Sequence, residues 1–248
     1  MSNTDFERKT RKDAKIFVHI PKNAGMTIRH SHLLKGKIFE TTDDRHKSPE
    51  YTAGLKKKMK ETNDHDGPHH ARWRDLRKDY RERFDAFAII RNPWDRVVSR
   101  YFFAKKVIEV EKKVDKSYAD VSSFEAFLEE RFKWGDQEYM WHRAIRGWTP
   151  AWDYVSDDHG LVSMCDAIRF EYLDEDMIAY FNLPHMTEAR NVTALNEFSY
   201  QSLYNSNTIK IIGDWYKSDI DHWGFDFDTG AQKNYWNEEI DIFKGEAI

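Results

Sequence analysis

The stretch KIFVHIPKNAGMTIRH, which runs from Lys15 to His30, decides the fold class of this chain. Its apolar, β-branched beginning predicts a buried strand, Pro21 ends strand pairing, and the small residues after it predict a tight turn into a helix. A second stretch, FAIIRNPWDRVVSRYF from Phe87 to Phe102, repeats this order of strand, turn and helix. Backbone N–H groups at such turns bind anions. The two stretches therefore predict an α/β protein with an anion site at two strand ends.

The polar side chains of both turns suit a phosphate or sulfate group. Lys22 supplies a mobile positive charge, and Thr27 supplies a hydroxyl in the first helical turn. In the second stretch, Arg91 at the strand end can contact a phosphate through two N–H groups, and Pro93 is favourable at the start of a helix. The first turn is not a Walker A loop, which has two glycines before its lysine, because here Lys22 precedes Gly25. An ATP kinase of that type is therefore disfavoured.

Both turns resemble the motifs of sulfotransferases that use 3′-phosphoadenosine 5′-phosphosulfate (PAPS), and in particular the carbohydrate-type, family 2-like branch. The first turn is similar to that branch's HIPKTAGTS signature, and the second reproduces its RNPWDR motif with Ser99 one helical turn further on. The resemblance continues to about Phe227 through the segments IRFEYLDEDM, LPHM and IIGDWYKSDIDHWGFDF. It implies a P-loop-like, three-layer α/β fold with a mostly parallel central sheet flanked by helices.

The resemblance also assigns roles to individual residues. Arg91 and Ser99 would bind the 3′-phosphate of the donor, and Lys22 would also act in catalysis by stabilising the leaving phosphate oxygen. The 5′-phosphosulfate would be held by Lys22, Asn23, Ala24, Gly25, Met26, Thr27 and Ile28. The family has hydroxyl residues where this chain has Asn23 and Met26, so we expect one side-chain hydrogen bond to the 5′ group to be absent. No metal ion is expected, because sulfuryl transfer from PAPS requires none.

A histidine is the expected general base, because its unperturbed pKa of about 6.5 lies close to neutral pH. His69 and His70 lie between the two motifs, immediately before Ala71. The family pattern has a histidine followed by small and basic residues ahead of the RNPW strand, and this pattern selects His70, with His69 as the alternative. The structural reading of His70 is that it caps the following helix or is solvated.

The same segment is rich in side chains that bind metals, namely Asp64, His65, Asp66, His69 and His70. His65 and His69 have the i, i+4 spacing of a helical metal site. However, Gly67 and Pro68 lie between them and break the helix on which that spacing depends. The sequence therefore favours a catalytic histidine over a metal site.

Periodicity and turn residues predict the other elements of the chain. Residues 1–13 are charged and aperiodic, which predicts a disordered tail before a single domain over residues 14–248. Residues 36–68 are the least predictable part. Helices are expected over residues 24–34, 53–61, 71–83, 124–132, 174–181 and 208–223 and from residue 93 past 103, and strands over residues 16–20, 84–90 and within 161–170.

The composition limits which partners and which cellular compartment we expect for the protein. The net charge of −4 includes basic clusters that are interleaved with acidic residues, so we interpret them as solvated helix faces and expect no nucleic-acid partner. Cys165 is the only cysteine, which excludes an intrachain disulfide, and the N-terminus lacks an apolar segment. We therefore expect a cytoplasmic protein with no membrane partner. The oligomeric state and the identity of the acceptor stay open.

Two other functions remain compatible with the sequence. The first is an ATP-dependent phosphotransferase that uses the same strand ends and needs Mg²⁺ with a carboxylate to hold it. The second is a non-catalytic nucleotide- or glycan-binding protein on this scaffold, which the departures at Asn23 and Met26 would allow. The preferred hypothesis is transfer of a sulfuryl group from PAPS to a hydroxyl, with a small-molecule alcohol or a carbohydrate as the acceptor.

Overall fold

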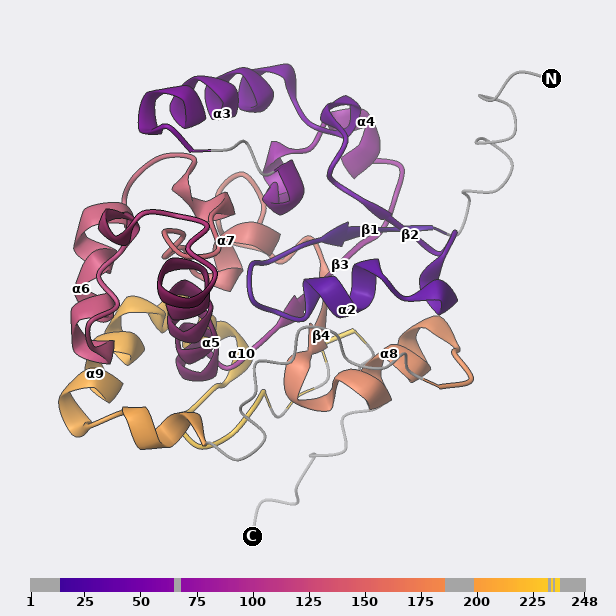
Figure 1. The fold of residues 1–248 in the computed structure, drawn as a ribbon. Helices are drawn as coiled ribbons and strands as arrows, with labels where there is room; N and C mark the ends of the chain where they lie inside the picture. The colour runs from indigo at the N-terminus through magenta and orange to yellow at the C-terminus, as the bar shows by residue number, and fades with distance from the viewer. Residues whose placement is uncertain (1–13, 65–67, 186–198, 232, 234, 237–248) are drawn as a thin grey trace, which may run out of the picture.

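The computed structural model describes residues 14–64, 68–185, 199–231, 233, 235 and 236. Within these residues the centre of the fold is a four-stranded parallel sheet with the strand order β2-β1-β3-β4 (Figure 1). The strands are β1 Lys15–Val18, β2 Ile38–Glu40, β3 Ala86–Ile90 and β4 Asp166–Arg169. This arrangement confirms the predicted α/β class with a parallel central sheet flanked by helices. The predicted tail, residues 1–13, lies outside the described residues.

The two faces of the sheet carry separate hydrophobic cores, because successive side chains of a strand point to opposite faces. On β1, Phe17 packs on one side, whereas Ile16 and Val18 pack on the other. Helices α2 Gly25–Arg29 and α8 Leu173–Phe181 cover the Phe17 face. Helix α5 Pro93–Lys105 lies on the opposite face. The remaining helices are α3 Pro49–Thr62, α4 Lys78–Arg81, α6 Phe124–Trp134, α7 Ala151–Val155, α9 Ser206–Trp215 and α10 Lys217–Trp223.

Short turns of 3₁₀ helix connect these elements. One of them, Pro68–His70, carries the predicted base, and Met140–His142 packs beside it. A π-helical turn, Lys106–Val110, extends α5 directly. The others are His32–Leu34, Asp44–His46, Trp73–Asp75, Lys116–Tyr118, Phe170–Tyr172 and Tyr200–Leu203.

The N-terminus of α5 is held by contacts from three directions. The side chain of Asn92 accepts hydrogen bonds from the first free N–H groups of the helix, and Pro93 occupies the first helical position. The amide nitrogen of the same side chain donates to the carbonyl oxygens of Asp226 and Thr229, each at 2.9 Å. The backbone N–H of Asn92 donates to Glu171 at 2.7 Å. These contacts fix the direction in which α5 leaves the sheet.

Several predicted elements differ from the structure. The continuous helix over residues 71–83 is wrong: Asp75 binds the side chain and N–H of Arg72, which favours a 3₁₀ turn, and α4 forms only after an extended residue. The helix over residues 24–34 ends at Arg29, and the helix over residues 208–223 is divided at Tyr216, where the backbone leaves helical geometry. Strand β2 was not predicted, because its three residues become a strand only by pairing with β1.

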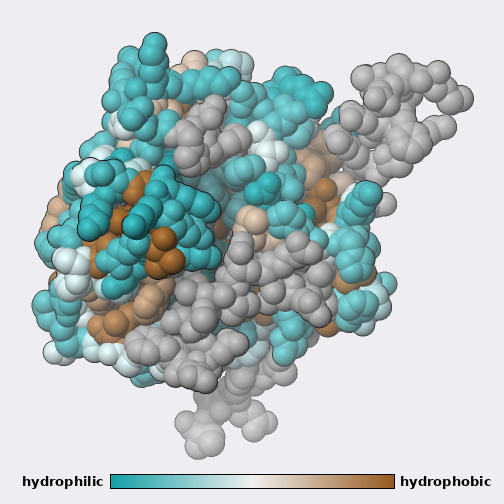
Figure 2. All heavy atoms as spheres, in the orientation of Figure 1, coloured by the Kyte–Doolittle hydropathy of each residue, from teal (hydrophilic) through white to brown (hydrophobic). Residues whose placement is uncertain are grey.

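The exposed surface is largely hydrophilic on the face shown in Figure 2. In the basic segment over residues 72–83, Arg77 pairs with Asp79 and Arg81 with Asp158, so these positive charges are balanced locally. Such exposed pairs contribute little to stability. No helix among the described residues is long and apolar enough to cross a membrane.

Candidate active site

The loop between β1 and α2 has a strained backbone that suits anion binding. Lys22 and Ala24 both have left-handed conformations, with φ of 70° and 55°, which non-glycine residues rarely adopt. Alternation of left- and right-handed residues turns successive N–H groups toward a common concavity. Within the described part of the chain, the N–H groups of Ala24, Gly25 and Met26 have no acceptor. The loop thus offers three backbone donors at one turn.

Side chains of this loop divide into anchoring and exposed groups. Asn23 is buried and donates to the carbonyl oxygen of Ile89 on β3 at 2.7 Å, so it ties the loop to the neighbouring strand. Ile28 lies in the core between the sheet and α2, which leaves only its backbone near the loop. Thr27 is buried at the start of α2, and Met26 is exposed. Neither Asn23, which is tied to β3, nor the apolar side chain of Met26 takes the place of the hydroxyl that the family has at its position.

The second predicted turn contacts the first directly. The guanidinium of Arg91 donates to the carbonyl oxygen of Lys22 at 2.8 Å and to the carboxylate of Asp95 at 2.7 Å. Its planar group also lies 4.0 Å from the centre of the Phe170 ring. Ser99 is buried one turn beyond Asp95 on the same face of α5, because residues four apart in a helix are neighbours. The structure thus brings Lys22, Arg91 and Ser99 to one region.

The side chain of Lys22 lies against α5. Its ammonium is 4.3 Å from the centre of the Phe103 ring, a favourable position for a cation. Burial, and after it the nearby charges of Arg91, Lys106 and Arg100, lower the pKa of Lys22 to about 7. An anionic ligand bound beside this ammonium would favour its charged form.

His70 is held in a defined orientation by β1. Its Nδ1 lies 2.8 Å from the carbonyl oxygen of His19, and because a carbonyl can only accept, Nδ1 carries the proton. The neutral ring therefore has its lone pair on Nε2. Burial is the main cause that lowers the pKa of His70 to about 3. The ring is therefore neutral near pH 7, but in the free protein it is a weaker base than the unperturbed pKa of about 6.5 predicted. The imidazole of His19 packs on that of His70, with 4.3 Å between ring centres.

The alternative base, His69, lies beside His70, with 6.3 Å between ring centres. It is partly buried. The structure gives His70 the direct contact with the end of β1, through the carbonyl of His19. His70 is thus the histidine that the end of β1 orients.

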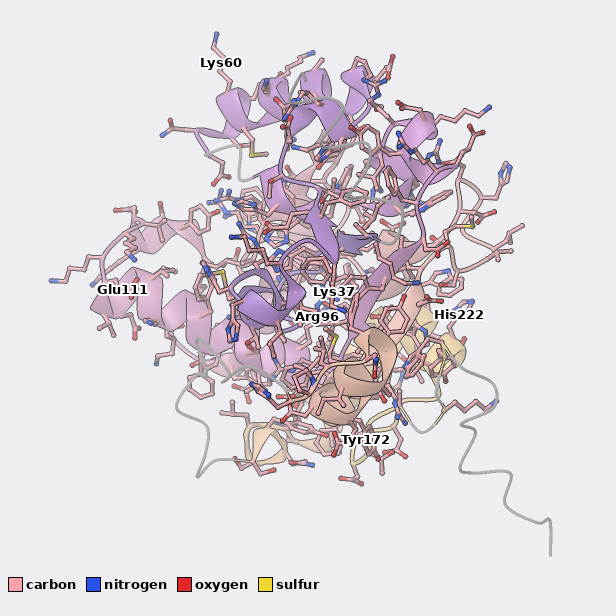
Figure 3. The ribbon with its side chains drawn as sticks, turned by 90° about the vertical axis from the view of Figure 1, so that its right-hand side faces the viewer. Lys37, Lys60, Arg96, Glu111, Tyr172 and His222 are labelled. Carbon is pink, nitrogen blue, oxygen red and sulfur yellow. The ribbon has the colours of Figure 1, made fainter. Side chains whose placement is uncertain are left out.

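Arg96 is a structural residue of the site whose partners the sequence did not predict. Its neighbour Asp95 pairs with Arg91, and Arg96 is fully buried. Arg96, which is labelled in Figure 3, donates to the carbonyl oxygens of Pro21 at 3.2 Å and Thr149 at 3.1 Å. Both partners are backbone atoms far away in the sequence, so no residue pattern could have indicated them. Arg96 thereby holds Pro21 in place at the start of the loop between β1 and α2.

The support continues to the C-terminal helices. Next to Thr149, the carboxylate of Asp219 on α10 accepts hydrogen bonds from the N–H groups of Ala151 and Trp152, each at 2.8 Å. Burial raises the pKa of Asp219 to about 6, and Arg96 opposes that rise. The charge of Arg96 thus acts on the buried carboxylate of Asp219.

The side chains over residues 64–70 that could bind a metal ion lie only partly within the described residues. Asp64 is engaged by Arg143 at 3.1 Å and Arg146 at 3.0 Å. His65 and Asp66 lie outside the described residues. Among the residues that the structure does describe, no group of three His, Cys, Asp or Glu side chains is arranged to hold a metal ion.

The site has a loop with free N–H groups, an arginine that contacts this loop and an oriented histidine. A comparison of the whole sequence with known protein families agrees with this arrangement. The model of the sulfotransferase family matches residues 9–226. The chain belongs to the sulfotransferase family. The resemblance inferred from the two motifs is thereby confirmed, and the parallel sheet is consistent with a sulfotransferase. No curated protein and no solved structure matches this sulfotransferase significantly.

Proposed function

We propose that this sulfotransferase moves a sulfuryl group from PAPS to a hydroxyl acceptor, with His70 as general base. The observation that carries the proposal is the hydrogen bond between Arg91 and the carbonyl of Lys22. It supports the proposal because PAPS has a 3′-phosphate and a 5′-phosphosulfate on one adenosine, and a single molecule can be held at both ends only where two anion-binding corners adjoin.

The residues of the site fit this donor. The free N–H groups of Ala24, Gly25 and Met26, together with Lys22, suit the 5′-phosphosulfate. Arg91 and Ser99 suit the 3′-phosphate. PAPS supplies the sulfuryl group as the donor substrate. The chain supplies cations and N–H donors where negative charge increases, which is the larger part of catalysis in group transfer to oxygen.

The chemical step balances without a metal ion or a redox partner. A lone pair of the acceptor hydroxyl forms a new S–O bond as the bond between sulfur and the bridging phosphate oxygen breaks. The hydroxyl proton moves to Nε2 of His70, which the hydrogen bond from Nδ1 to His19 leaves as the basic nitrogen. Lys22 stabilises the negative charge on the leaving phosphate oxygen. The products are the sulfate ester and 3′-phosphoadenosine 5′-phosphate.

The class of acceptor follows from the family resemblance alone, which favours a carbohydrate. The cytoplasmic setting likewise stays a prediction that rests on the single cysteine, Cys165. A panel of glycans and simple alcohols incubated with PAPS, followed by mass spectrometry for an added sulfo group, would identify the acceptor. If no member of a broad panel is sulfated, the binding-protein alternative gains support.

The variant His70→Gln tests the assignment of the base. Loss of general-base catalysis lowers turnover by about 10²- to 10⁴-fold, whereas affinity for 3′-phosphoadenosine 5′-phosphate should change little, because the base contacts the acceptor. The matched control is His69→Gln, which should retain most of the activity. Equal losses in both variants, or a loss only in His69→Gln, would contradict the assignment.

A phosphotransferase would behave differently in a binding experiment. It should need Mg²⁺ and should discriminate little in favour of a 3′-phosphate. We expect 3′-phosphoadenosine 5′-phosphate to bind far more tightly than AMP in the presence of a chelator. Equal affinities, or binding that depends on Mg²⁺, would overturn the proposal in favour of this alternative.

A further inference from the structure

A third cation lies on the face of α5 that carries Ser99. Lys106 follows Ser99 by seven residues, which is close to two helical turns and therefore the same side of the helix. Between them on this face is Phe103, whose ring lies under the ammonium of Lys22. Lys106 is also one of the three cations near enough to Lys22 to act on its charge. The positive charges of Arg91, Lys22 and Lys106 thus follow one another along α5.

The direction of Lys106 is set by the local backbone. At this residue α5 changes from an α-helix to a π-helical turn, Lys106–Val110. Such turns are rare and occur often at functional sites. The following two residues, Val107 and Ile108, are buried in the core, so they anchor the turn and leave Lys106 on the exposed side.

The charge of Lys106 is only weakly balanced by the protein. Its ammonium lies 3.5 Å from Glu111, with 60% of its side chain exposed. The same carboxylate has a closer partner in Lys113, at 2.9 Å. Glu111 lies at the outer end of this segment (Figure 3). Lys106 is therefore available to an anion bound beside Lys22.

We propose that Lys106 is a further donor-binding residue, which contacts the anionic groups of the adenosine donor from the π-helical turn that follows α5. This inference rests on the proposed function, since it assumes that the donor binds at Lys22 and Arg91. Lys106 stands outside both sequence motifs that carry the family resemblance. Its role depends on the geometry of α5, which places it two turns from Ser99.

The variant Lys106→Met tests this inference by calorimetric titration with 3′-phosphoadenosine 5′-phosphate. We expect affinity to fall about 5- to 20-fold, because a charge-assisted contact to a phosphate is lost. The difference from wild type should shrink at high salt, which screens exposed charges. Lys106→Arg should bind nearly as wild type, because it retains the positive charge.

Lys113→Met is the matched control, because Lys113 loses the same charge and pairs with the same Glu111. It should bind within about twofold of wild type, since its effect on the site is only long-range and screened. Equal affinities of Lys106→Met and Lys113→Met would overturn the inference. If wild type itself does not bind the nucleotide, the proposed function fails first, so the two failures can be distinguished.

Discussion

The imidazole of His19 occupies the space into which a side chain on Gly25 would project. The same histidine accepts a hydrogen bond from His70 through its backbone carbonyl. One residue at the end of β1 therefore contacts both the turn that leads into α2 and the candidate base. This explains why the first residue of α2 is a glycine although its backbone needs no left-handed conformation.

We predict that Gly25→Ala impairs the site. The added Cβ would overlap the ring of His19, so the ring or the turn must move. Overpacking of this kind costs about 1–3 kcal/mol of unfolding free energy, and donor affinity should fall about tenfold or more because the N–H groups lose their arrangement. Urea unfolding and nucleotide titration measure the two effects.

The control for this prediction is Gly213→Ala on α9. There a Cβ would meet only the ring of Trp94 at 3.4 Å, an ordinary contact. Alanine is favoured over glycine in a helix by about 1 kcal/mol, so this variant should be as stable as wild type or more stable, with unchanged nucleotide affinity. Normal nucleotide binding by Gly25→Ala would refute the role given to the close contact with His19.

Met26→Thr should strengthen donor binding. Met26 is exposed in the first turn of α2, where the family resemblance implies a hydroxyl residue. A threonine there adds one hydrogen-bond donor to an anion, which is worth about 0.5–1.5 kcal/mol. We expect the dissociation constant of 3′-phosphoadenosine 5′-phosphate to fall severalfold with little change in thermal stability. Weaker binding would show that the 5′ group does not approach residue 26.

The pKa of Lys22 predicts a pH dependence of donor binding. In the free protein this pKa is lowered to about 7, so the ammonium is charged below that pH and neutral above it. An anion binds the charged form, so affinity should decrease as the pH rises from about 6 to about 9. Lys22→Met should bind more weakly at low pH and should lack this decrease, apart from the titration of the nucleotide itself.

The lowered pKa of Lys22 also makes the stability of the free protein depend on pH. Because the folded-state pKa of Lys22 lies below its unfolded value of 10.5, the charged group destabilises the fold below about pH 7. That destabilisation is relieved as the pH rises between the two values. Stability measured against pH should therefore rise more steeply for wild type than for Lys22→Met in this range, and identical slopes would contradict the lowered pKa.

Arg96→Met should destabilise the whole molecule. It removes both hydrogen bonds to Pro21 and Thr149 and a positive charge that acts on the buried carboxylate of Asp219. Each buried carbonyl oxygen that loses its donor costs about 1–3 kcal/mol of unfolding free energy. Arg77→Met removes only an exposed ion pair and should leave the stability nearly unchanged. Chemical denaturation distinguishes the two, and equal costs would show that Arg96 does not support the loop.

Arg96→Lys provides a finer test of the same contact. Lysine keeps the charge but cannot reach two carbonyl oxygens with the planar geometry of a guanidinium. We expect a smaller loss of stability than in Arg96→Met together with a measurable loss of nucleotide affinity. Retention of full affinity would mean that the position of Pro21 does not depend on this side chain.

Much of the fold could be predicted because it depends on local patterns. The apolar run before Pro21 and the run before Arg91 form β1 and β3, and the turns that follow them lead into α2 and α5. Hydrogen bonds within a helix and the alternation of a strand connect residues that are close in sequence. Strand β2 and the divided helix at Tyr216 were missed because their conformations depend on distant partners.

The order of residues along the chain placed Lys22 and Arg91 after two strands and His70 between them, and its two motifs indicated the family. The packed structure was needed to show that Arg91 contacts the carbonyl of Lys22 and that His19 orients His70. It was also needed to show that Arg96 supports Pro21. These contacts join residues 51 to 75 positions apart through carbonyl oxygens. Every residue has such a carbonyl, so the amino-acid pattern cannot reveal which one is used until the sheet and helices pack.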